Sequence, residues 1–558
     1  MSKKEIDDIK IKIAGMNTER SSFISHWREL SEYIDPVRGR FFTSDRNKGE
    51  RRNNKIINSR GGQALRTYQS GMFTGIMSPA RPWFKLETLD ADIMSSEPAK
   101  VWLYQVEERM RAILMDSNLY SMAPVALGEH GLFGTAAMSQ LDDFDSVARF
   151  YTHTVGSYMI AQNDRHIVDT FVLERERTVA QLVSQYGMDK VSGHVRNKME
   201  RNQGQTWIPV TQYIAPNEKY NPDDESVVAM PFKSCVFETG TSDGQYLSKS
   251  GFEEFPVHVA RFALTAEDVY STNSPGMIAL GDIKGLQMME RRKAQAIDKM
   301  VNPPLKGPPS LRDVPVSSLP GGLTVYDGDG TREGLSTVYQ VEPRINEMRQ
   351  EIASVEARIN EAYFVDLFLA ISSMQGVQPR NQLELSQRNE ERLLMLGPSL
   401  ERLQQDFLSK IVERLFNQVM RANIMPPPPE ELAGVSLNIR FVSAIAQAQR
   451  SHEVGTMERA VGFAGSLAQF DPSVLDKLNT DASFERYVQL IGGNPSILVP
   501  DAEVAEMRAA REEQKKQQAQ AIQAQQKASA LSSTAKAGKT AVEAEVAAQA
   551  NAAAAPQG

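Results

Sequence analysis

The chain has 558 residues, which is long enough to bury more than one hydrophobic core and to divide into several units. Its formal net charge is -8 at pH 7, and its single cysteine, Cys235, excludes an intrachain disulfide framework and suits a reducing cytoplasm. Residues 1–5 show no secretory signal, and the most apolar run, residues 363–371, is short and contains Asp366, so we expect no membrane-spanning segment.

The first 34 residues carry apolar side chains at intervals of three and four, which predicts one long amphipathic helix. The Asp35-Pro36 dipeptide ends the pattern because the residue before a proline disfavours helical geometry. Gly15 is a candidate weak point within the helix. The apolar positions are Ile6, Ile9, Ile13, Met16, Phe23, Trp27, Leu30 and Ile34.

A basic, polar segment follows at residues 38–60. Its cations have two interpretations: contact with DNA or with an acidic face of a neighbouring subunit, or a solvated loop, which is the usual role of such a charge run. The cations are Arg38, Arg40, Arg46, Lys48, Arg51, Arg52, Lys55 and Arg60.

Between Val147 and Phe262 the sequence changes to short alternating runs, which are typical of strands. Turns are expected at Asn163-Asp164 and at residues 240–244. A capping box formed by Thr178 and Gln181 predicts a short helix that ends at Gly187. This part of the chain is therefore predicted to be an α+β unit.

Three long helical patterns, separated by two non-helical inserts, occupy residues 277–419. The first, residues 277–299, would be roughly 35 Å long. Six prolines and three glycines at residues 301–322 remove backbone donors and fix φ, so we expect an irregular knob with only short strands. The helical period returns after Pro343 and continues to the polar segment 372–381. These features predict an elongated helical hairpin with a knob at one end and a polar loop at the other.

The third helical pattern ends before the four prolines at residues 426–429. Its apolar positions include Leu400, Leu403, Phe407, Ile411, Leu415 and Val419.

Alanine and glutamine dominate residues 501–558. Alanine favours helix, yet so few large apolar residues cannot hold an isolated helix against a core. Two interpretations remain: a helix that packs through small residues against copies of itself in a ring, or a disordered tail. We expect helix from 501 to about 530 and disorder after Ser532.

Enzyme and metal motifs are present only in unsuitable contexts. Residues 240–244 have the G-x-S-x-G spacing of a nucleophile elbow, but residues 245–249 are typical of the returning strand of a hairpin. The Asp-Gly-Asp-Gly run at 327–330 lacks the glutamate of a calcium loop, because its twelfth position is Val338. There is no Walker A motif, and the seven histidines show no metal-site spacing. We therefore expect no enzyme activity, cofactor or metal.

Three separated segments resemble the portal proteins, or head-to-tail connectors, of short-tailed bacteriophages. They are SGMFTGIMSPARPWF at residues 70–84, SPGMIALGDIK with AIDKMVNPP at residues 274–304, and RNEERLLMLGP at residues 388–398. The resemblance extends from about Trp27 to Phe416, with the segments in the order expected for the family. Residues 379–385 depart from the family pattern.

The resemblance implies a mostly helical α+β portal fold, present commonly as a ring of twelve copies at one capsid vertex, through which double-stranded DNA is packaged and later ejected. The parts implied are a wing (1–276), a first stem helix (277–300), a clip (301–342), a second stem helix (343–371), a tunnel loop (372–381), wing helices with the returning chain (382–480), and a C-terminal crown or barrel helix with a tail (481–558).

The resemblance also implies roles for individual residues. The tunnel loop would face DNA through polar groups that touch phosphates without binding them tightly: Gln375, Gln378, Arg380 and Asn381. Channel lining or contacts between subunits would involve charged residues of the stem, namely Lys284, Arg291, Arg292, Lys293, Glu347, Glu351 and Glu356. The clip would bind partners through Leu305, Lys306, Leu311, Arg312, Val325 and Tyr326.

The partners implied are further copies of the chain, the terminase large subunit, a tail adaptor, and capsid and scaffolding proteins. The implied location is the portal vertex of the virion, after assembly in the host cytoplasm. Twelve copies at -8 each would carry roughly -96 charges, which suits passage of a duplex and argues against sequence-specific DNA binding. The alternative is a non-enzymatic internal scaffold or adaptor protein of a virion that forms no ring.

Overall fold

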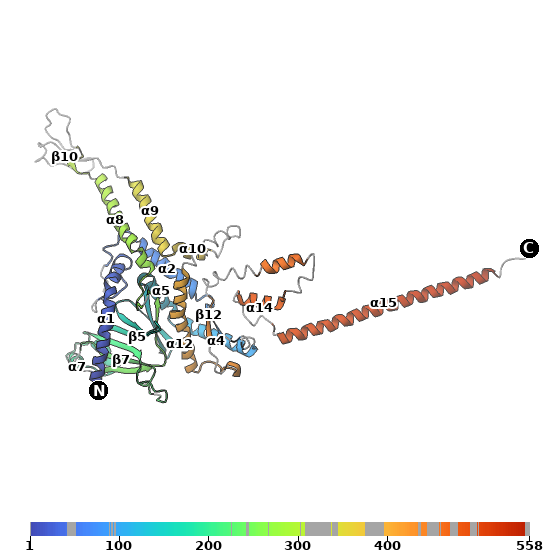
Figure 1. Ribbon diagram of the computed structural model, residues 1–558, viewed down its shortest axis with the longest axis horizontal. Coiled ribbons are helices and arrows are strands. Elements are labelled where there is room, and N and C mark those ends of the chain that lie inside the picture. The colour runs from blue at the N-terminus through green and yellow to red at the C-terminus, as the bar shows by residue number, and fades with distance from the viewer. Residues whose placement is uncertain are drawn as a thin grey trace, which may run out of the picture. The chain divides into compact units, whose positions relative to one another are not determined.

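The computed structural model of the chain divides into two compact units, residues 1–95 with 102–455 and residues 96–101 with 456–558. Helices and antiparallel strands both build the first unit (Figure 1). The residues described are 2–41, 52–88, 90, 93, 96–224, 226–240, 245–265, 267–301, 303–306, 336–337, 344–373, 396–432, 437–442, 457, 459–468, 478–490, 499 and 501–552.

Two antiparallel sheets form the strand-rich part of the first unit. The larger has the strand order β4-β5-β6-β7-β8 and the smaller β3-β2-β9, and both predicted hairpins, β4-β5 and β7-β8, are confirmed. Two strand pairs, β1-β12 and β10-β11, lie outside these sheets. The strands are β1 Phe84–Thr88, β2 Thr135–Asp143, β3 Val147–His153, β4 Tyr158–Gln162, β5 Val168–Thr178, β6 Trp207–Pro216, β7 Phe232–Glu238, β8 Tyr246–Phe252, β9 Val257–Arg261, β10 Leu305–Lys306, β11 Ser336–Thr337 and β12 Leu437–Phe441.

Helix α1 (Ser2–Tyr33) packs on one face of the five-stranded sheet. The helix predicted at the N-terminus is confirmed, and it continues through Gly15 because its apolar stripe is held against the sheet on both sides of this residue. The shared core contains Ile6, Ile9, Met16, Met159, Val172, Tyr213, Ala215, Cys235 and Phe237.

The opposite face of the same sheet is covered by α6 (Val179–Tyr186) and α7 (Gly193–Glu200). The predicted capping box is confirmed: Thr178 Oγ1 accepts a hydrogen bond from Gln181 N at 3.2 Å, and Gln181 Oε1 accepts one from Thr178 N at 3.1 Å. Gly187, with φ +84°, follows the helix as predicted.

Helices α5 (Leu119–Phe133) and α12 (Ser409–Arg421) pack on the three-stranded sheet. The third predicted helical pattern is confirmed from Leu396 to Arg421, with a five-residue π-helical segment, η3 (Gln404–Leu408), inside it. Further helices are α2 Arg60–Ile76, α4 Glu97–Asp116, α8 Pro275–Val301, α9 Ile345–Ala362, α10 Val365–Ser373 and the 3₁₀ turn η4 Glu430–Leu432.

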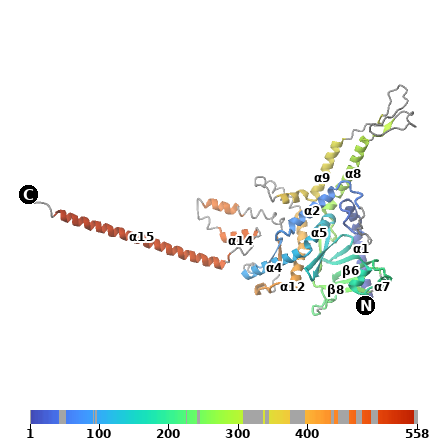
Figure 2. The same cartoon turned by 180° about the vertical axis from the view of Figure 1, so that it is seen from behind.

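Helices α8 and α9 lie side by side as the predicted helical hairpin (Figures 1 and 2). At the end away from the sheets, Leu305 and Lys306 of β10 pair antiparallel with Thr337 and Ser336 of β11. These two-residue strands agree with the expectation that only short strands can form in the proline-rich insert.

The second predicted helix of the hairpin is not continuous to residue 371, which corrects the sequence interpretation. It ends at Ala362, and Phe364 has a φ of +54°, a left-handed conformation that breaks the helix before α10 begins at Val365. The physical reason is packing on α2. Tyr363 and Phe368 both make edge-on ring contacts with Tyr68, at centroid distances of 6.3 and 5.8 Å, and the break in the helix accompanies this shared packing.

The second unit contains α14 (Thr480–Leu490) and α15 (Asp501–Ala552). Arg508 donates hydrogen bonds to both carboxylate oxygens of Asp481, at 2.7 and 2.8 Å. The expectation of disorder after Ser532 is wrong, because α15 continues to Ala552. Its described side chains there are exposed, so the intrinsic helix propensity of alanine, rather than a core, accounts for the extension.

Candidate assembly surfaces

The base of the hairpin α8–α9 is built from apolar side chains that the helices share with each other and with the rest of the first unit. Ile283 and Leu286 of α8 and Ile359 of α9 are fully buried. Helix α8 contacts α1, α2 and α5 as well as α9. The base of the hairpin is therefore part of the main core and cannot move independently of it.

A buried amide fastens the hairpin to the chain segment before α2. Gln287 Oε1 accepts hydrogen bonds from Ile57 N at 2.6 Å and Asn58 N at 2.8 Å, while its Nε2 donates to Asn58 O at 3.0 Å. Asn58 Nδ2 in turn donates to Glu356 Oε1 at 3.0 Å. Sequence analysis missed this clamp. Its only signal is an amide at a position between buried apolar residues of α8.

Charged residues of the hairpin form several ion pairs within one chain. Lys284 pairs with Glu29 of α1, and Lys293 pairs with Glu290 on its own helix at 2.5 Å. The link between α8 and α9 is an ion pair of Arg358 with Asp282 at 3.0 Å.

The three glutamates predicted to act in the stem differ in their contacts within one chain. Glu347 pairs with Arg344 at 3.1 Å, and Glu356 accepts the hydrogen bond from Asn58. Glu351, Arg291 and Arg292 are exposed and form no ion pair with other described residues. Roles in channel lining or between subunits stay predictions for all seven residues.

The far half of the hairpin exposes apolar side chains that two helices alone cannot cover. Contiguous exposed apolar surface commonly marks an interaction site. In this half of α8 the exposed apolar residues are Met288, Ile297, Met300 and Val301.

The predicted DNA-facing residues Gln375, Gln378, Arg380 and Asn381 lie outside the described residues, as do the clip residues Leu311, Arg312, Val325 and Tyr326. Of the two remaining clip residues, Leu305 and Lys306 form β10, and Lys306 is exposed. Their binding roles stay predictions.

The basic segment after α1 includes a cation with a structural role. Arg38, whose side chain is 15% exposed, pairs with Asp35 at 2.9 Å and with the buried Glu129 at 3.3 Å. Burial raises the pKa of Glu129, while Arg38 acts against this shift. Lys55 pairs with Glu32 at 2.5 Å. Because its guanidinium is paired with carboxylates of the same chain, Arg38 fits neither a DNA contact nor a solvated loop.

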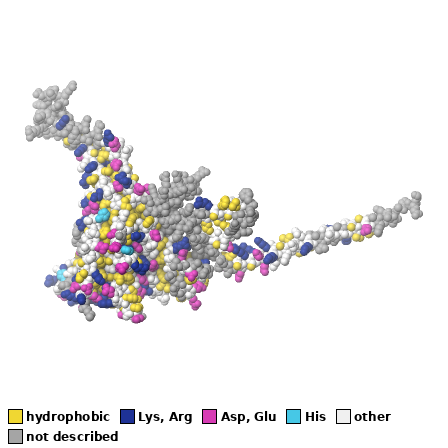
Figure 3. All heavy atoms as spheres, in the orientation of Figure 1, with side chains coloured by type: hydrophobic (Ala, Val, Ile, Leu, Met, Phe, Trp, Pro, Cys, Tyr) yellow, Lys and Arg dark blue, Asp and Glu magenta, His cyan; other side chains and the backbone are white. Residues whose placement is uncertain are grey.

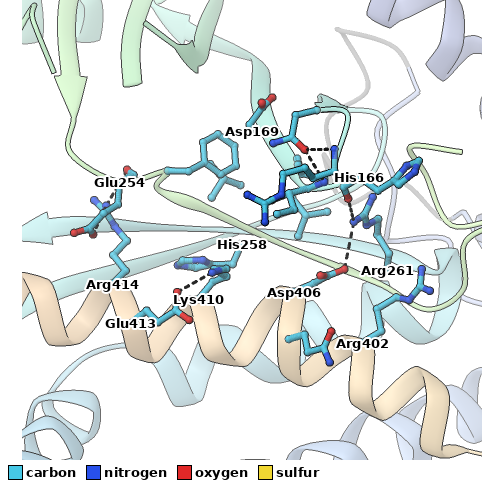
Figure 4. A pocket seen from close by; sticks show the side chains of 18 of the residues that line it. His166, Asp169, Glu254, His258, Arg261, Arg402, Asp406, Lys410, Glu413 and Arg414 are labelled. Atoms are coloured by element: carbon cyan, nitrogen blue, oxygen red, sulfur yellow. Dashed lines mark hydrogen bonds and ion pairs between the residues drawn. The ribbon is translucent and has the colours of Figure 1, made fainter. Parts of the chain in front are cut away.

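A groove of about 1080 Å³ lies between β9, the β4-β5 turn and the helix that contains η3 (Figure 4). The buried Arg261 donates hydrogen bonds to Gln162 Oε1 and His166 O, both at 2.8 Å, and pairs with Asp406 of η3 at 3.3 Å. A π-helical segment often marks a functional position. Here it lies where Asp406 meets Arg261.

Farther along this groove, the charged groups are also paired. Arg414 pairs with Glu254 at 3.3 Å, and Lys410 pairs with Glu413 at 2.7 Å. Burial, followed by the charge of Arg414, lowers the pKa of His258 well below its ordinary value. The imidazole of His258 is therefore neutral and buried in this groove.

The G-x-S-x-G segment connects two antiparallel strands, as predicted, and not a strand to a helix. No cluster of three or more possible metal-ligating His, Cys, Asp or Glu side chains occurs within the described ranges. In the same ranges, no helix has the length and hydropathy needed to cross a membrane. On the visible face, basic, acidic and hydrophobic side chains are interspersed over the described parts of the hairpin and sheets (Figure 3).

A helical hairpin that is anchored in an α+β body and exposes several apolar side chains toward its far end is characteristic of a structural assembly subunit. Residues 7–498 match the family model described as bacteriophage head to tail connecting protein. The chain is 40% identical over 516 residues to the portal protein of Salmonella phage epsilon15, covering 92% of each chain. It is 40% identical over 501 residues to the probable portal protein of Bordetella phage BPP-1, covering 90% of each.

The chain therefore belongs to the bacteriophage head-to-tail connecting protein family, the portal proteins, and the resemblance is confirmed. Its place is the head-to-tail junction of the virion, and no finding favours the internal scaffold or adaptor. The solved structures that match the chain include the neck of an empty GTA particle, at 12% identity and a TM-score of 0.39, covering 83% of this chain and 98% of the other. A second is the virion of a native gene transfer agent, at 9% identity and a TM-score of 0.35, covering 86% and 99%.

Proposed function

We propose that about twelve copies of the chain form a ring whose central channel conducts double-stranded DNA during packaging and ejection. The observation that carries this proposal is the change in burial along α8. Ile283 is fully buried at the base, whereas Val301 at the far end is 71% exposed. Neighbouring copies around an axis would cover the exposed part without disturbing the base.

In this arrangement, residues 1–276 and 382–480 correspond to the wing, 277–300 and 343–371 to the stem, and 301–342 to the clip. Residues 372–381 correspond to the tunnel loop and 481–558 to the crown or barrel with its tail. The clip would bind the terminase large subunit during packaging and a tail adaptor afterwards. The wing would contact capsid and scaffolding proteins, and assembly would take place in the host cytoplasm.

The chain would act without chemistry of its own, so the energy for moving DNA must come from a partner. Excess negative charge on the ring supports this role because it keeps contact with the duplex weak. The tunnel loop residues Gln375 and Gln378 would contact phosphates only transiently.

The experiment is a determination of the mass and shape of the purified chain. Native mass spectrometry and negative-stain images are expected to show rings of about twelve copies with a central hole, and purified rings should hydrolyse no ATP above background. Monomers or dimers at every concentration, or closed particles without a hole, would contradict the proposal.

A further inference from the structure

Two arginines on β5 form a cationic cluster that no described residue neutralises through an ion pair. Arg175 and Arg177 lie opposite Val210 and Ile208 of β6, and alternate residues of a strand face the same side of a sheet. The Nε atoms of both arginines are buried and make no hydrogen bond. Neither guanidinium forms an ion pair with any described residue, and the nearby Glu174 pairs instead with Arg20 of α1, at 3.3 Å.

Aromatic side chains surround this cluster. Tyr186 of α6 and Tyr151 of β3 lie beside Arg175, and Tyr151 is 45% exposed. Burial, followed by the like charge of Arg177, lowers the pKa of Arg175. An accessible cationic site of this kind, with aromatic rings at its edge, suits a carboxylate that is presented together with an aromatic ring. We call Arg175, Arg177, Tyr151 and Tyr186 the arginine patch.

The tip of the β2-β3 hairpin has the complementary chemistry. Phe144, at the turn, is fully exposed, with a relative exposure of 109%. Aspartates flank it at positions 142, 143 and 145. Asp145 is exposed and forms no ion pair with other described residues. A fully exposed phenylalanine between acidic residues is an unusual feature for the surface of a subunit that acts alone.

The turn that presents Phe144 is held in one conformation. Asp143 Oδ2 accepts hydrogen bonds from Ser146 N at 3.1 Å and Ser146 Oγ at 2.8 Å. Gln418 Nε2 of α12 donates to Asp142 Oδ1 at 2.6 Å. Val147 has a φ of +63°, a strained conformation for a β-branched residue. A rigid turn loses little conformational entropy when its exposed ring is buried by a partner.

The tip and the arginine patch of one chain are too far apart to meet. Strand β3 rises about 3.3 Å per residue, so about 13 Å of strand separates Val147 at the turn from Tyr151, which borders Arg175. Two complementary surfaces at separate positions on one chain make a head-to-tail contact between copies, which closes into a ring when the rotation permits.

We propose that the acidic, phenylalanine-bearing tip of one copy docks on the arginine patch of the next copy in the ring. Phe144 packs against Tyr151 and the guanidinium planes, and the Asp145 carboxylate pairs with Arg177. This inference rests on the proposed ring, but it specifies a contact outside the helical hairpin.

The first test is cross-linking between engineered cysteines. Cys235 is the chain's single cysteine and is buried, so introduced exposed thiols will react selectively. A chain carrying Phe144→Cys and Tyr151→Cys, assembled and treated with a short bismaleimide, is expected to give a ladder of covalent oligomers. The matched control carries Phe144→Cys and Tyr220→Cys, because Tyr220 is 51% exposed, and it should give no ladder.

The second test is charge exchange. Asp145→Arg alone and Arg177→Glu alone are each expected to raise the concentration needed for ring formation at least tenfold, and the double variant should restore assembly. Asp223→Arg, on an exposed loop, is the control for a change in net charge. Restoration cannot arise from misfolding, so the pair of variants separates contact from stability.

The outcomes distinguish the two proposals. If the unaltered chain forms no rings, the proposed function itself fails. If it forms rings, but the ladder is absent and the charge variants assemble normally or the double variant does not recover, the docking contact is wrong.

Discussion

Replacing Gln287 with leucine should loosen the attachment of the hairpin without unfolding the chain. The change removes the three hydrogen bonds to Ile57 and Asn58 and leaves two backbone N–H groups and one carbonyl without their partner. An unsatisfied buried group costs about 1–3 kcal/mol. Water can reach part of this segment, because Ile57 is 49% exposed, so we expect a total loss of about 2–4 kcal/mol, below the sum of the three.

Hydrogen exchange followed by mass spectrometry measures this loss locally. A loss of about 2–4 kcal/mol corresponds to an increase in amide exchange of roughly 30-fold or more for residues 57–58, since each 1.4 kcal/mol is tenfold. Gln295→Leu is the control because it makes the same substitution at an exposed position of α8. Unchanged exchange at residues 57–58 in Gln287→Leu, or an equal increase in the control, would refute the reasoning.

Two further predictions concern the core. A Cβ at Gly71 would lie 2.2 Å from Phe368 Cγ. Gly71→Ala should therefore separate α2 from α10 and lower the free energy of unfolding, measured with denaturant, by about 1–3 kcal/mol. The control is Gly15→Ala, which should not destabilise the chain because its Cβ meets nothing within 4 Å. Burial raises the pKa of Glu107 from 4.5 to about 7, so its contribution to stability is most favourable below pH 4.5 and falls as the pH rises toward 7, by about 3 kcal/mol. Glu107→Gln should remove this loss when unfolding is measured from pH 4.5 to 8, and an unchanged pH profile would contradict the assignment.

Local periodicity predicted those elements whose side chains are sorted by a single packing surface. Helix α1 buries its stripe on one sheet, and α8 buries one face at its base, so intervals of three and four were sufficient. The capping box at Thr178 is equally local, since all of its hydrogen bonds lie within four residues.

The break at Phe364 could not be predicted in this way. Its cause is non-local, because Tyr363 and Phe368 pack on Tyr68, almost 300 positions earlier in the sequence. The same limit applies to the groove, where Arg261 meets Asp406, and to the clamp of Gln287 on Asn58. In each case the sequence contains both partners, but only the tertiary fold brings them together.

Burial along the hairpin also bears on how folding and assembly are separated. The base of α8 folds with the body, through Ile283 and the clamp at Gln287, and is complete in one copy. Met300 and Val301 at the far end remain exposed, and burying an apolar side chain of this size contributes about 1.5–3 kcal/mol. In the proposed ring, this free energy would be gained only on assembly. A single copy would therefore fold first, and the free energy of burying Met300 and Val301 would then favour the contact with its neighbours.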